Sequence, residues 1–473
     1  MPYRESCLSG SVFPTWTVGA IMARSCRCEE ATLSDRQKAA LEDDDPVQGL
    51  ARRLVANTVL QIAGSLGGAF IAFATFLLAT HELGPERFGV FAVAVAYTTI
   101  PTILAEGGLT SVLVREISRK PSEMGEVLSK ALPARAILAL LVVLAAAATS
   151  TALPFTTATR WAIAAALIGA FVSLLSYAMM PALQVRLRMG WVAVANVVGS
   201  LVTLSLSAAT LAVGGGLPGF VISWTCGSIV TSVVQFWGGM RLVRIRPRVD
   251  WAFSRWLLRE ASIIGAAGGI GSIAFRVDAV LLATLASSHA VGIYSVAFKY
   301  VDTIVMILAA VGTSILPAMS VFAQPGGDIR MRGLSQAAAE IAVAAGVPVI
   351  VIGALQASEV LTVLGGSAYL SGKHALQVLA AVPLLVFINS ALIEKALLAQ
   401  HRERSLLALN SLFLLANVVL NVVLIPRWGL MAAAFTTLVT EGHGLVQVSC
   451  CSIGSSASSH GPKPFQLQLE PGE

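Results

Sequence analysis

The sequence predicts an all-α integral membrane protein, and its composition, its apolar segments and the placement of its basic residues carry that prediction. Apolar residues make up 56% of the 473 residues, charged residues make up only 12%, and the mean hydropathy is +0.78. Soluble domains contain about 25% charged residues, so this composition excludes an ordinary soluble globular protein. We therefore expect most of the chain to lie in a bilayer.

Apolar segments long enough to cross a bilayer recur along the whole chain. A transmembrane helix needs about 20 mostly apolar residues, and twelve such segments are bounded by charged residues, Gly or Pro. The twelfth is the weakest, because Glu441 and His443 lie inside it. The expected helices of the first half span residues 55–80, 88–106, 134–154, 161–183, 191–213 and 218–240. Those of the second half span residues 261–286, 291–318, 335–355, 375–398, 405–425 and 429–450.

Lys and Arg are concentrated in alternate connections between these helices. The positive-inside rule predicts this alternation if the number of helices is correct. Nineteen of them precede the first helix or follow even-numbered helices, and four follow odd-numbered helices. Both termini are therefore expected in the cytoplasm, and the net charge of +6 indicates orientation in the membrane rather than a nucleic-acid partner. The basic connections span residues 52–53, 115–135, 186–188, 241–259, 330–332 and 402–404.

The two ends of the chain are expected to be tails outside the membrane. Residues 1–51 hold an apolar stretch that Pro14 breaks, and they lack the pattern of a cleaved signal peptide, so we expect a disordered cytoplasmic tail. Residues 451–473 are expected to form a polar C-terminal tail. The six cysteines show no metal-ligand spacing, and their expected cytoplasmic or membrane setting disfavours a disulfide framework. We expect neither a metal nor another cofactor.

The second half of the chain repeats the first. Residues 62–80 align with 266–284 at an offset of 204 and share the tetrapeptide LLAT. With one gap, residues 88–97 align with 291–300, and the tetrapeptide ANVV occurs in the fifth expected helix of each half. Because six is an even number, both copies cross the membrane in the same sense and form parallel repeats. We expect two pseudo-symmetric six-helix bundles with a central cleft. The two bundles span residues 52–245 and 246–450.

Four ionisable residues interrupt the apolar seventh and eighth helices. They are Arg276, Asp278, Lys299 and Asp302, and the first copy has Ala72, Ala74, Ala96 and Thr99 at the aligned positions. Packing of the scaffold therefore does not require charge there. An ionisable side chain at membrane depth costs about 2.5–3.5 kcal/mol and normally faces the bundle interior or a wet cavity. At about 1.5 Å of rise per residue, Arg276 and Asp302 lie roughly 16–18 Å deep, and Asp278 and Lys299 lie roughly 13 Å deep.

Two interpretations of these four side chains stay open. In the first, they form a structural clamp of ion pairs between the two helices. In the second, Arg276 and Lys299 attract an anionic substrate, while Asp278 or Asp302 holds or titrates with a coupling cation, H⁺ or Na⁺. Glu106, near the inner end of the second helix, is a further candidate for coupling or an ion pair, although a place at the membrane interface is favoured over one in the cleft.

Four segments carry a resemblance to a known family. They are "LLATHELGPERFGVFAVAVAYTTIPTILAEGGLTSVLVREISR", "FRVDAVLLATLASSHAVGIYSVAFKYVD", "TSILPAMS" and "ANVVLNVVLIPRWGLMAAA". They resemble the polysaccharide or oligosaccharide flippases of the multidrug/oligosaccharidyl-lipid/polysaccharide (MOP) exporter superfamily over about residues 52–441. The resemblance implies translocation of an undecaprenyl-diphosphate-linked glycan across the bacterial inner membrane. It also implies a MATE-like, V-shaped pair of six-helix lobes around a cationic cavity, with Arg276 and Lys299 where such flippases carry cavity cations.

Two alternative functions, an antiporter and a membrane enzyme, would need different features of the sequence. A multidrug or cation antiporter of the same superfamily would need a net acidic cleft, and two acids against two bases leave that alternative open. A membrane glycosyltransferase or polymerase would need a large polar catalytic loop, and the connections between the expected helices are too short for one. We therefore expect a transporter and not an enzyme. Its expected partners are the lipid-linked glycan and membrane lipid, with glycosyltransferases and a polymerase acting nearby.

Overall fold

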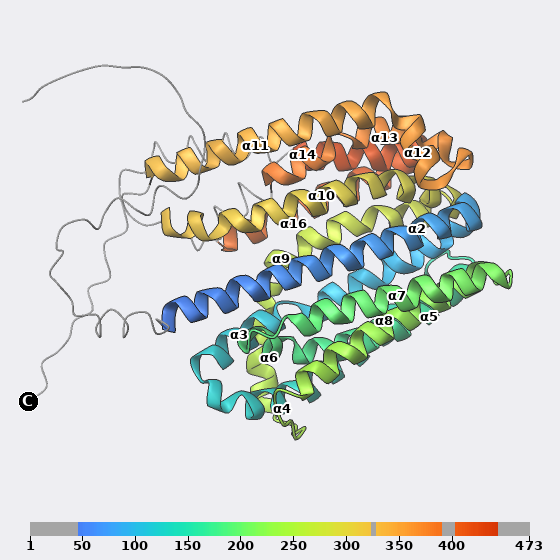
Figure 1. Cartoon of the computed structure of the whole chain (residues 1–473). Helices are drawn as coiled ribbons and strands as arrows, with labels where there is room; N and C mark the ends of the chain where they lie inside the picture. The colour runs from blue at the N-terminus through green and yellow to red at the C-terminus, as the bar shows by residue number, and fades with distance from the viewer. Residues whose placement is uncertain (1–45, 323–327, 390–402, 443–473) are drawn as a thin grey trace, which may run out of the picture. The chain divides into compact units, whose positions relative to one another are not determined.

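The computed structural model describes residues 46–322, 328–389 and 403–442, and these residues form helices joined by short turns, with no strand among them. The chain divides into two units, Met1–Ala56 and Asn57–Glu473. The described residues of the first unit are the opening turns of helix α2, which begins at Pro46, inside the expected tail. The second unit holds all the other helices, and Figure 1 shows them running lengthwise beside one another.

The first half of the second unit follows the expected order of helices. α2 ends at Glu106, but Gly84 inside it has φ 66° and ψ 174°, which is not helical. α2 is thus two helices, a first arm (residues 46–83) and a second arm (residues 85–106), which match the first two expected helices. Glycine reaches this positive φ without a Cβ clash. The helices after α2 are α3 (Leu109–Arg119), α4 (Met124–Ala152), α5 (Thr157–Ser176), α6 (Met180–Val185), α7 (Gly190–Ala212) and α8 (Gly216–Met240).

The second half begins with two long helices. Asp250 caps the first of them, since its Oδ1 accepts a hydrogen bond from the backbone N–H of Phe253 at 3.0 Å. The described helices are α9 (Trp251–Leu285), α10 (Ser288–Phe322), α11 (Asp328–Leu355), α12 (Ala357–Gly365), α13 (Lys373–Leu379), α14 (Val382–Phe387), α16 (Glu403–Trp428) and the helix Leu430–Gly442.

Equivalent helices of the two halves pack in equivalent ways. The first arm of α2 lies against α7, where a Cβ on Gly68 would meet the Cβ of Asn196 at 3.4 Å. In the second half α9 lies against α16, where a Cβ on Gly271 would meet the side-chain amide of Asn410 at 3.3 Å. Small residues let membrane helices approach closely, and Gly68 and Gly271 do so at these two contacts.

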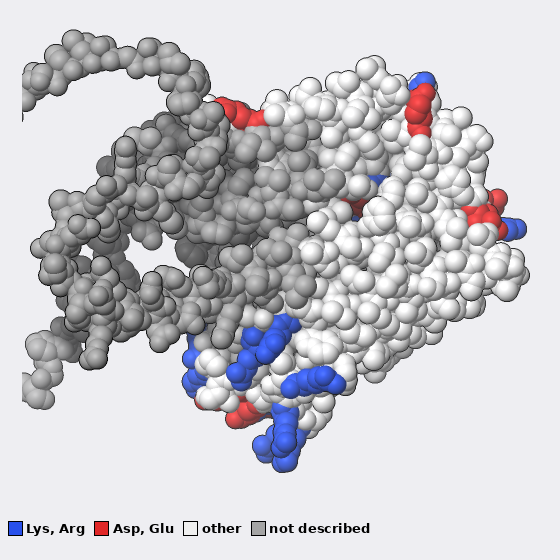
Figure 2. Space-filling view, in the orientation of Figure 1, with Lys and Arg blue, Asp and Glu red and all other residues white. Residues whose placement is uncertain are grey.

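The outer surface of the helices suits a lipid environment. Large apolar side chains are exposed there, including Phe70 (77%), Leu141 (60%) and Leu415 (60%). Figure 2 shows charged side chains gathered toward the ends of the helices, with acidic and basic atoms at one place within the white face between them. Six helices of the described part, or seven with one bent pair, are long and apolar enough to cross a membrane. The chain is a multi-pass membrane protein, and the count of twelve helices stays a prediction.

Two helices, α4 and α9, begin ten residues earlier than expected, and the path of the chain differs from the expected one at three places. The connection after the second helix contains the helix α3, whose buried Leu109, Val112, Leu113 and Ile117 follow a helical period. α11 bends by 83° into α12 rather than ending in a loop. The expected helix 375–398 is interrupted at residues 380–381, because Pro383 lacks an N–H and its ring crowds the preceding turn. Residues 390–398 of that helix lie outside the described part of the chain.

Candidate functional site

Arg276 and Asp302 form an ion pair that joins α9 to α10. The distance from Arg276 Nη1 to Asp302 Oδ2 is 3.5 Å, and the two side chains are 39% and 35% exposed. Their matched depths along the two helices place them within reach of each other. The pair is therefore open enough for a third group to contact it, and the guanidinium keeps N–H donors that Asp302 does not use.

Lys299 points from α10 toward the first half of the chain. Its Nζ lies 5.4 Å from the centre of the Phe76 ring, on the first arm of α2. A cation over an aromatic face is attracted by the ring quadrupole, but this contact does not neutralise the charge. Among the described residues Lys299 makes no ion pair with an acid, and it does not pair with Asp278, which lies at a similar depth along its helix. The structure thus brings Arg276 and Asp302 together and leaves Lys299 as a cation beside Phe76.

Asp278 lies in a different place from the other three ionisable residues. Its side chain is buried, at 1% exposure, and accepts hydrogen bonds from Asn421 Nδ2 (2.8 Å), Thr437 Oγ1 (2.7 Å) and Tyr294 Oη (3.2 Å). Asn421 Nδ2 also donates to Asn417 Oδ1 at 3.0 Å. These partners come from α10, α16 and the helix Leu430–Gly442, so the carboxylate is the centre of a cluster that joins four helices.

The Asp278 cluster consists of oxygen-rich neutral groups around one acid. No Lys or Arg of the described residues pairs with Asp278, and Asn421 Oδ1 is buried without a hydrogen-bond partner in that part of the chain. Such a group of oxygen atoms suits a proton or a hard cation better than an organic anion. The described residues contain no group of three or more His, Cys, Asp or Glu that could hold a metal.

The partners of Asp278 were not predicted from the sequence. Asn421 and Thr437 are 143 and 159 residues away from Asp278, and neutral polar side chains at membrane depth give a weaker signal than charges. The sequence nevertheless contained one indication of this cluster. Asn417 belongs to the repeated tetrapeptide ANVV, and Asn421 is a second amide one turn later on the same helix face.

Glu106 belongs to a separate network within the first half. Its Oε2 accepts a hydrogen bond from Arg135 Nη1 at 3.2 Å, and Arg135 Nη2 donates to Thr110 Oγ1 at 2.9 Å. The sequence pattern predicts Arg135 in a basic connection, but the structure buries it within α4, at 4% exposure. The ion pair with Glu106 explains how the guanidinium is tolerated there. Glu106 therefore has a structural partner and does not join the group around Arg276.

Two glycines hold the second arm of α2 against the beginning of α10. A Cβ on Gly89 would overlap the Ser288 carbonyl group, and one on Gly292 would overlap the Pro85 carbonyl group. Gly89 and Gly292 occupy aligned positions of the repeat. The two halves thus meet through equivalent glycines at the end of the helices that the positive-inside pattern predicts to be outer.

The opposite end of the helices is also closed. A Cβ on Gly265 would overlap the backbone of Gly107, and Arg115 on α3 forms an ion pair with Glu260 on α9. Gly107 and Gly108 both have positive φ values, 38° and 76°, so the chain turns sharply where α9 approaches. In this structure the two halves are in contact at both ends of the helices.

A sequence-family comparison decides the class of protein. The family model described as "Polysaccharide biosynthesis protein" matches residues 54–322, which is more than half of the chain. The chain belongs to the polysaccharide biosynthesis protein family. A similar protein, "Probable flippase AglR" of Haloferax volcanii, is 23% identical to this member over an alignment of 410 residues, with 83% of this chain and 82% of that protein covered. The resemblance to flippases of the MOP superfamily is confirmed.

Solved structures show the fold of this polysaccharide biosynthesis protein. An inward-facing multidrug resistance MATE family transporter of the MOP superfamily superimposes with a TM-score of 0.67 at 15% identity, covering 85% of this chain and 99% of that one. The lipid II flippase MurJ in an inward closed conformation superimposes with a TM-score of 0.68 at 13% identity, covering 84% of this chain and 87% of that one. The expected MATE-like all-α fold is confirmed.

Proposed function

We propose that this protein flips an undecaprenyl-diphosphate-linked oligosaccharide across the bacterial inner membrane by alternating access, with Arg276 and Lys299 contacting the diphosphate. The observation that carries the proposal is a pair of partly exposed cations. Arg276 has a single 3.5 Å contact to an acid, and Lys299 lies over an aromatic ring. A doubly anionic head group loses hydration as it crosses hydrocarbon, and fixed cations replace part of that hydration. The polyprenyl tail stays in the bilayer.

The placement of Asp278 favours an anionic substrate over a cationic one. The sequence alone has two acids and two bases in this region, but Asp278 is enclosed in its own cluster and does not face Arg276 or Lys299. The accessible group is thus two bases and one acid, Asp302. A transporter of cationic drugs would need the opposite balance. The names of the similar proteins, a probable flippase and a lipid II flippase, support the same class of substrate.

Asp278 is our candidate for the group that couples transport to an ion. A buried carboxylate surrounded only by neutral donors carries a charge that the described protein does not compensate, so binding of H⁺ or Na⁺ is favourable there. Its partners lie on α10, α16 and the helix Leu430–Gly442. Binding or release of a cation would therefore change how four helices pack, which is the kind of link that alternating access requires.

The proposal is tested by reconstituting the full chain in vesicles and measuring the translocation of an undecaprenyl-diphosphate-linked oligosaccharide. We expect Arg276→Gln and Lys299→Gln each to insert normally and to lower transport at least tenfold, since a charge-assisted hydrogen bond is worth about 1.5–3 kcal/mol. Arg255→Gln is the matched control, because Arg255 is an exposed arginine on the same helix as Arg276. Native transport in both variants would overturn the proposal.

A further inference from the structure

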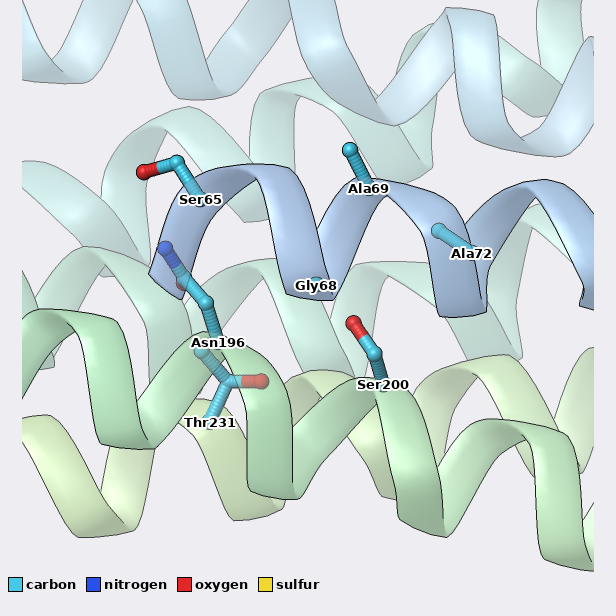
Figure 3. A pocket seen from close by; sticks show the side chains of 7 residues that line it. All are labelled: Ser65, Gly68, Ala69, Ala72, Asn196, Ser200 and Thr231. Carbon is cyan, nitrogen blue, oxygen red and sulfur yellow. The ribbon is translucent and has the colours of Figure 1, made fainter. Parts of the chain in front are cut away.

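A small cavity lies in the first half of the protein, between the first arm of α2, α7 and α8. Its volume is about 240 Å³. Ser65, Gly68, Ala69 and Ala72 line it from α2, and Asn196 and Ser200 line it from α7. Thr231 of α8 completes the lining, and Figure 3 shows the side chains of Asn196 and Ser200 rising from α7 toward α2. None of the seven lining residues is charged.

The internal repeat explains why the cavity exists in this half. The alignments of α2 with α9 and of α7 with α16 show which side chains occupy the same places in the other half, and four of them are larger there. Gly68, Ala69, Ala72 and Ser200 correspond to Ser272, Ile273, Arg276 and Asn421. The fold therefore accepts bulk at these positions, and the space in the first half results from its own small side chains rather than from the scaffold.

Three of the four polar side chains around the cavity have no hydrogen-bond partner in the part of the chain that the structure describes. Ser65, Asn196 and Ser200 make no side-chain hydrogen bond to any residue in the described ranges, whereas Thr231 donates to the Gly227 carbonyl at 3.0 Å. Two hydroxyls and one carboxamide offer both donors and acceptors. A cation would need acids, a phosphate would need bases or backbone N–H groups, and a lipid chain would need an apolar lining. Sugar hydroxyls, which both donate and accept, match what is present.

The cavity lies next to the cations of the candidate site. Ala72 lines the cavity, and Phe76 is one turn further along the same face of α2, about 6 Å away by helical rise. Lys299 Nζ lies 5.4 Å from the Phe76 ring. In a lipid-diphosphate glycan the first sugar is attached directly to the diphosphate. A diphosphate at Lys299 would thus hold its first sugar at the Ala72 end of the cavity.

We propose that this cavity is a subsite for the first sugar of the lipid-linked glycan. The inference rests on the proposed function. It adds that the two halves of the protein recognise different parts of the substrate: the second half binds the diphosphate, and the first half binds the sugar. The volume is below the range of about 300–1,000 Å³ for drug-sized ligands. One sugar ring is therefore the unit that enters, and the remaining sugars stay outside the cavity.

The test is a binding measurement with the full-length protein in lipid nanodiscs. The probes are undecaprenyl diphosphate and the same lipid carrying one glucose, galactose or N-acetylglucosamine. We expect at least one sugar to raise the affinity over the bare lipid. Asn196→Ala and Ser200→Ala should each lower that preference about fivefold, as the loss of one neutral hydrogen bond does, and should leave the affinity for bare undecaprenyl diphosphate unchanged.

Two further variants keep the outcomes distinct. Ser205→Ala, at an exposed position of α7, should change neither affinity, and thermal unfolding without ligand shows whether the cavity variants fold normally. Lys299→Gln should lower the affinity for both probes. An unchanged sugar preference in folded Asn196→Ala and Ser200→Ala proteins would overturn the sugar subsite alone. An unchanged affinity for bare undecaprenyl diphosphate in both Lys299→Gln and Arg276→Gln would overturn the proposed diphosphate site.

Discussion

The glycine contact between α2 and α10 predicts how a single methyl group changes the access state. In Gly89→Ala the new Cβ would lie 2.6 Å from the Ser288 carbonyl carbon, and in Gly292→Ala it would lie 2.8 Å from the Pro85 carbonyl carbon. Carbon atoms in contact prefer about 3.5–4.0 Å. Both substitutions meet backbone, which cannot rotate away, and the carbonyl oxygens lie nearer than the carbons, so the second arm of α2 and the beginning of α10 must separate by at least about 1 Å.

The overlap raises the free energy only of the conformation in which the second arm of α2 and the beginning of α10 are in contact. Extra bulk in a packed contact typically costs about 1–3 kcal/mol. A conformation in which the two helices separate does not carry that cost, so the equilibrium shifts toward it by the same free energy. A difference of about 1–3 kcal/mol corresponds to a population shift of about 5–150-fold. We expect Gly89→Ala to favour the conformation that is open at the predicted outer end.

The assay is the rate at which an impermeant thiol reagent labels Thr99→Cys from outside intact cells, in a background without other cysteines. Thr99 aligns with Asp302 in the repeat. Gly89→Ala should raise the labelling rate about 5–150-fold. Gly67→Ala, where the new Cβ would meet only Val197 Cγ2 at an ordinary 3.7 Å, should leave it unchanged. If Gly89→Ala inserts normally and labels at the native rate, the glycine contact does not control access.

Three other predictions follow from the same sites. Arg276→Ala combined with Asp302→Ala should insert normally but stay inactive, because the arginine binds substrate; recovery of full transport in the double variant would leave the pair a structural clamp. Asp278→Asn keeps the size of the side chain but cannot ionise, and its NH₂ group replaces one of the two oxygens that accept hydrogen bonds. Vesicle transport should therefore lose its response to an imposed pH or Na⁺ gradient, and a native response would remove the coupling role of Asp278. A cysteine at Ser287 should react with an impermeant reagent from outside, whereas one at Arg248 should not; the reverse pattern would invert the topology.

Much of the candidate site was predictable from local patterns. The long apolar segments, the basic connections and the repeat follow from neighbours in sequence and from the thickness of a bilayer. The repeat also served as an internal control, since it has Ala72 where the second half has Arg276 and Thr99 where it has Asp302. Helical rise alone placed Arg276 and Asp302 at matched depth, and they form an ion pair at 3.5 Å.

The environment of each charge was not predictable in the same way. Depth along a helix does not specify which neighbour a side chain faces, so the sequence could not separate Asp278 from Lys299, which lie at similar depth. The structure encloses Asp278 among Asn421, Thr437 and Tyr294, and it turns Lys299 toward Phe76 in the other half. Arg135 is a similar case, because a basic residue near a helix end has the same pattern whether it is exposed or buried against an acid.

The amino-acid sequence is enough to identify a multi-pass helical membrane protein and to predict two related halves and four charges at membrane depth. These properties depend on composition and on regular spacing, which each helix carries within itself. The packing of the helices is needed to show that Asp278 is enclosed, that Arg276 and Lys299 stay partly exposed, and that small side chains of the first half leave a polar cavity at Ala72, one turn from Phe76. Those properties depend on contacts between helices more than 100 residues apart, and such contacts exist only after the helices pack.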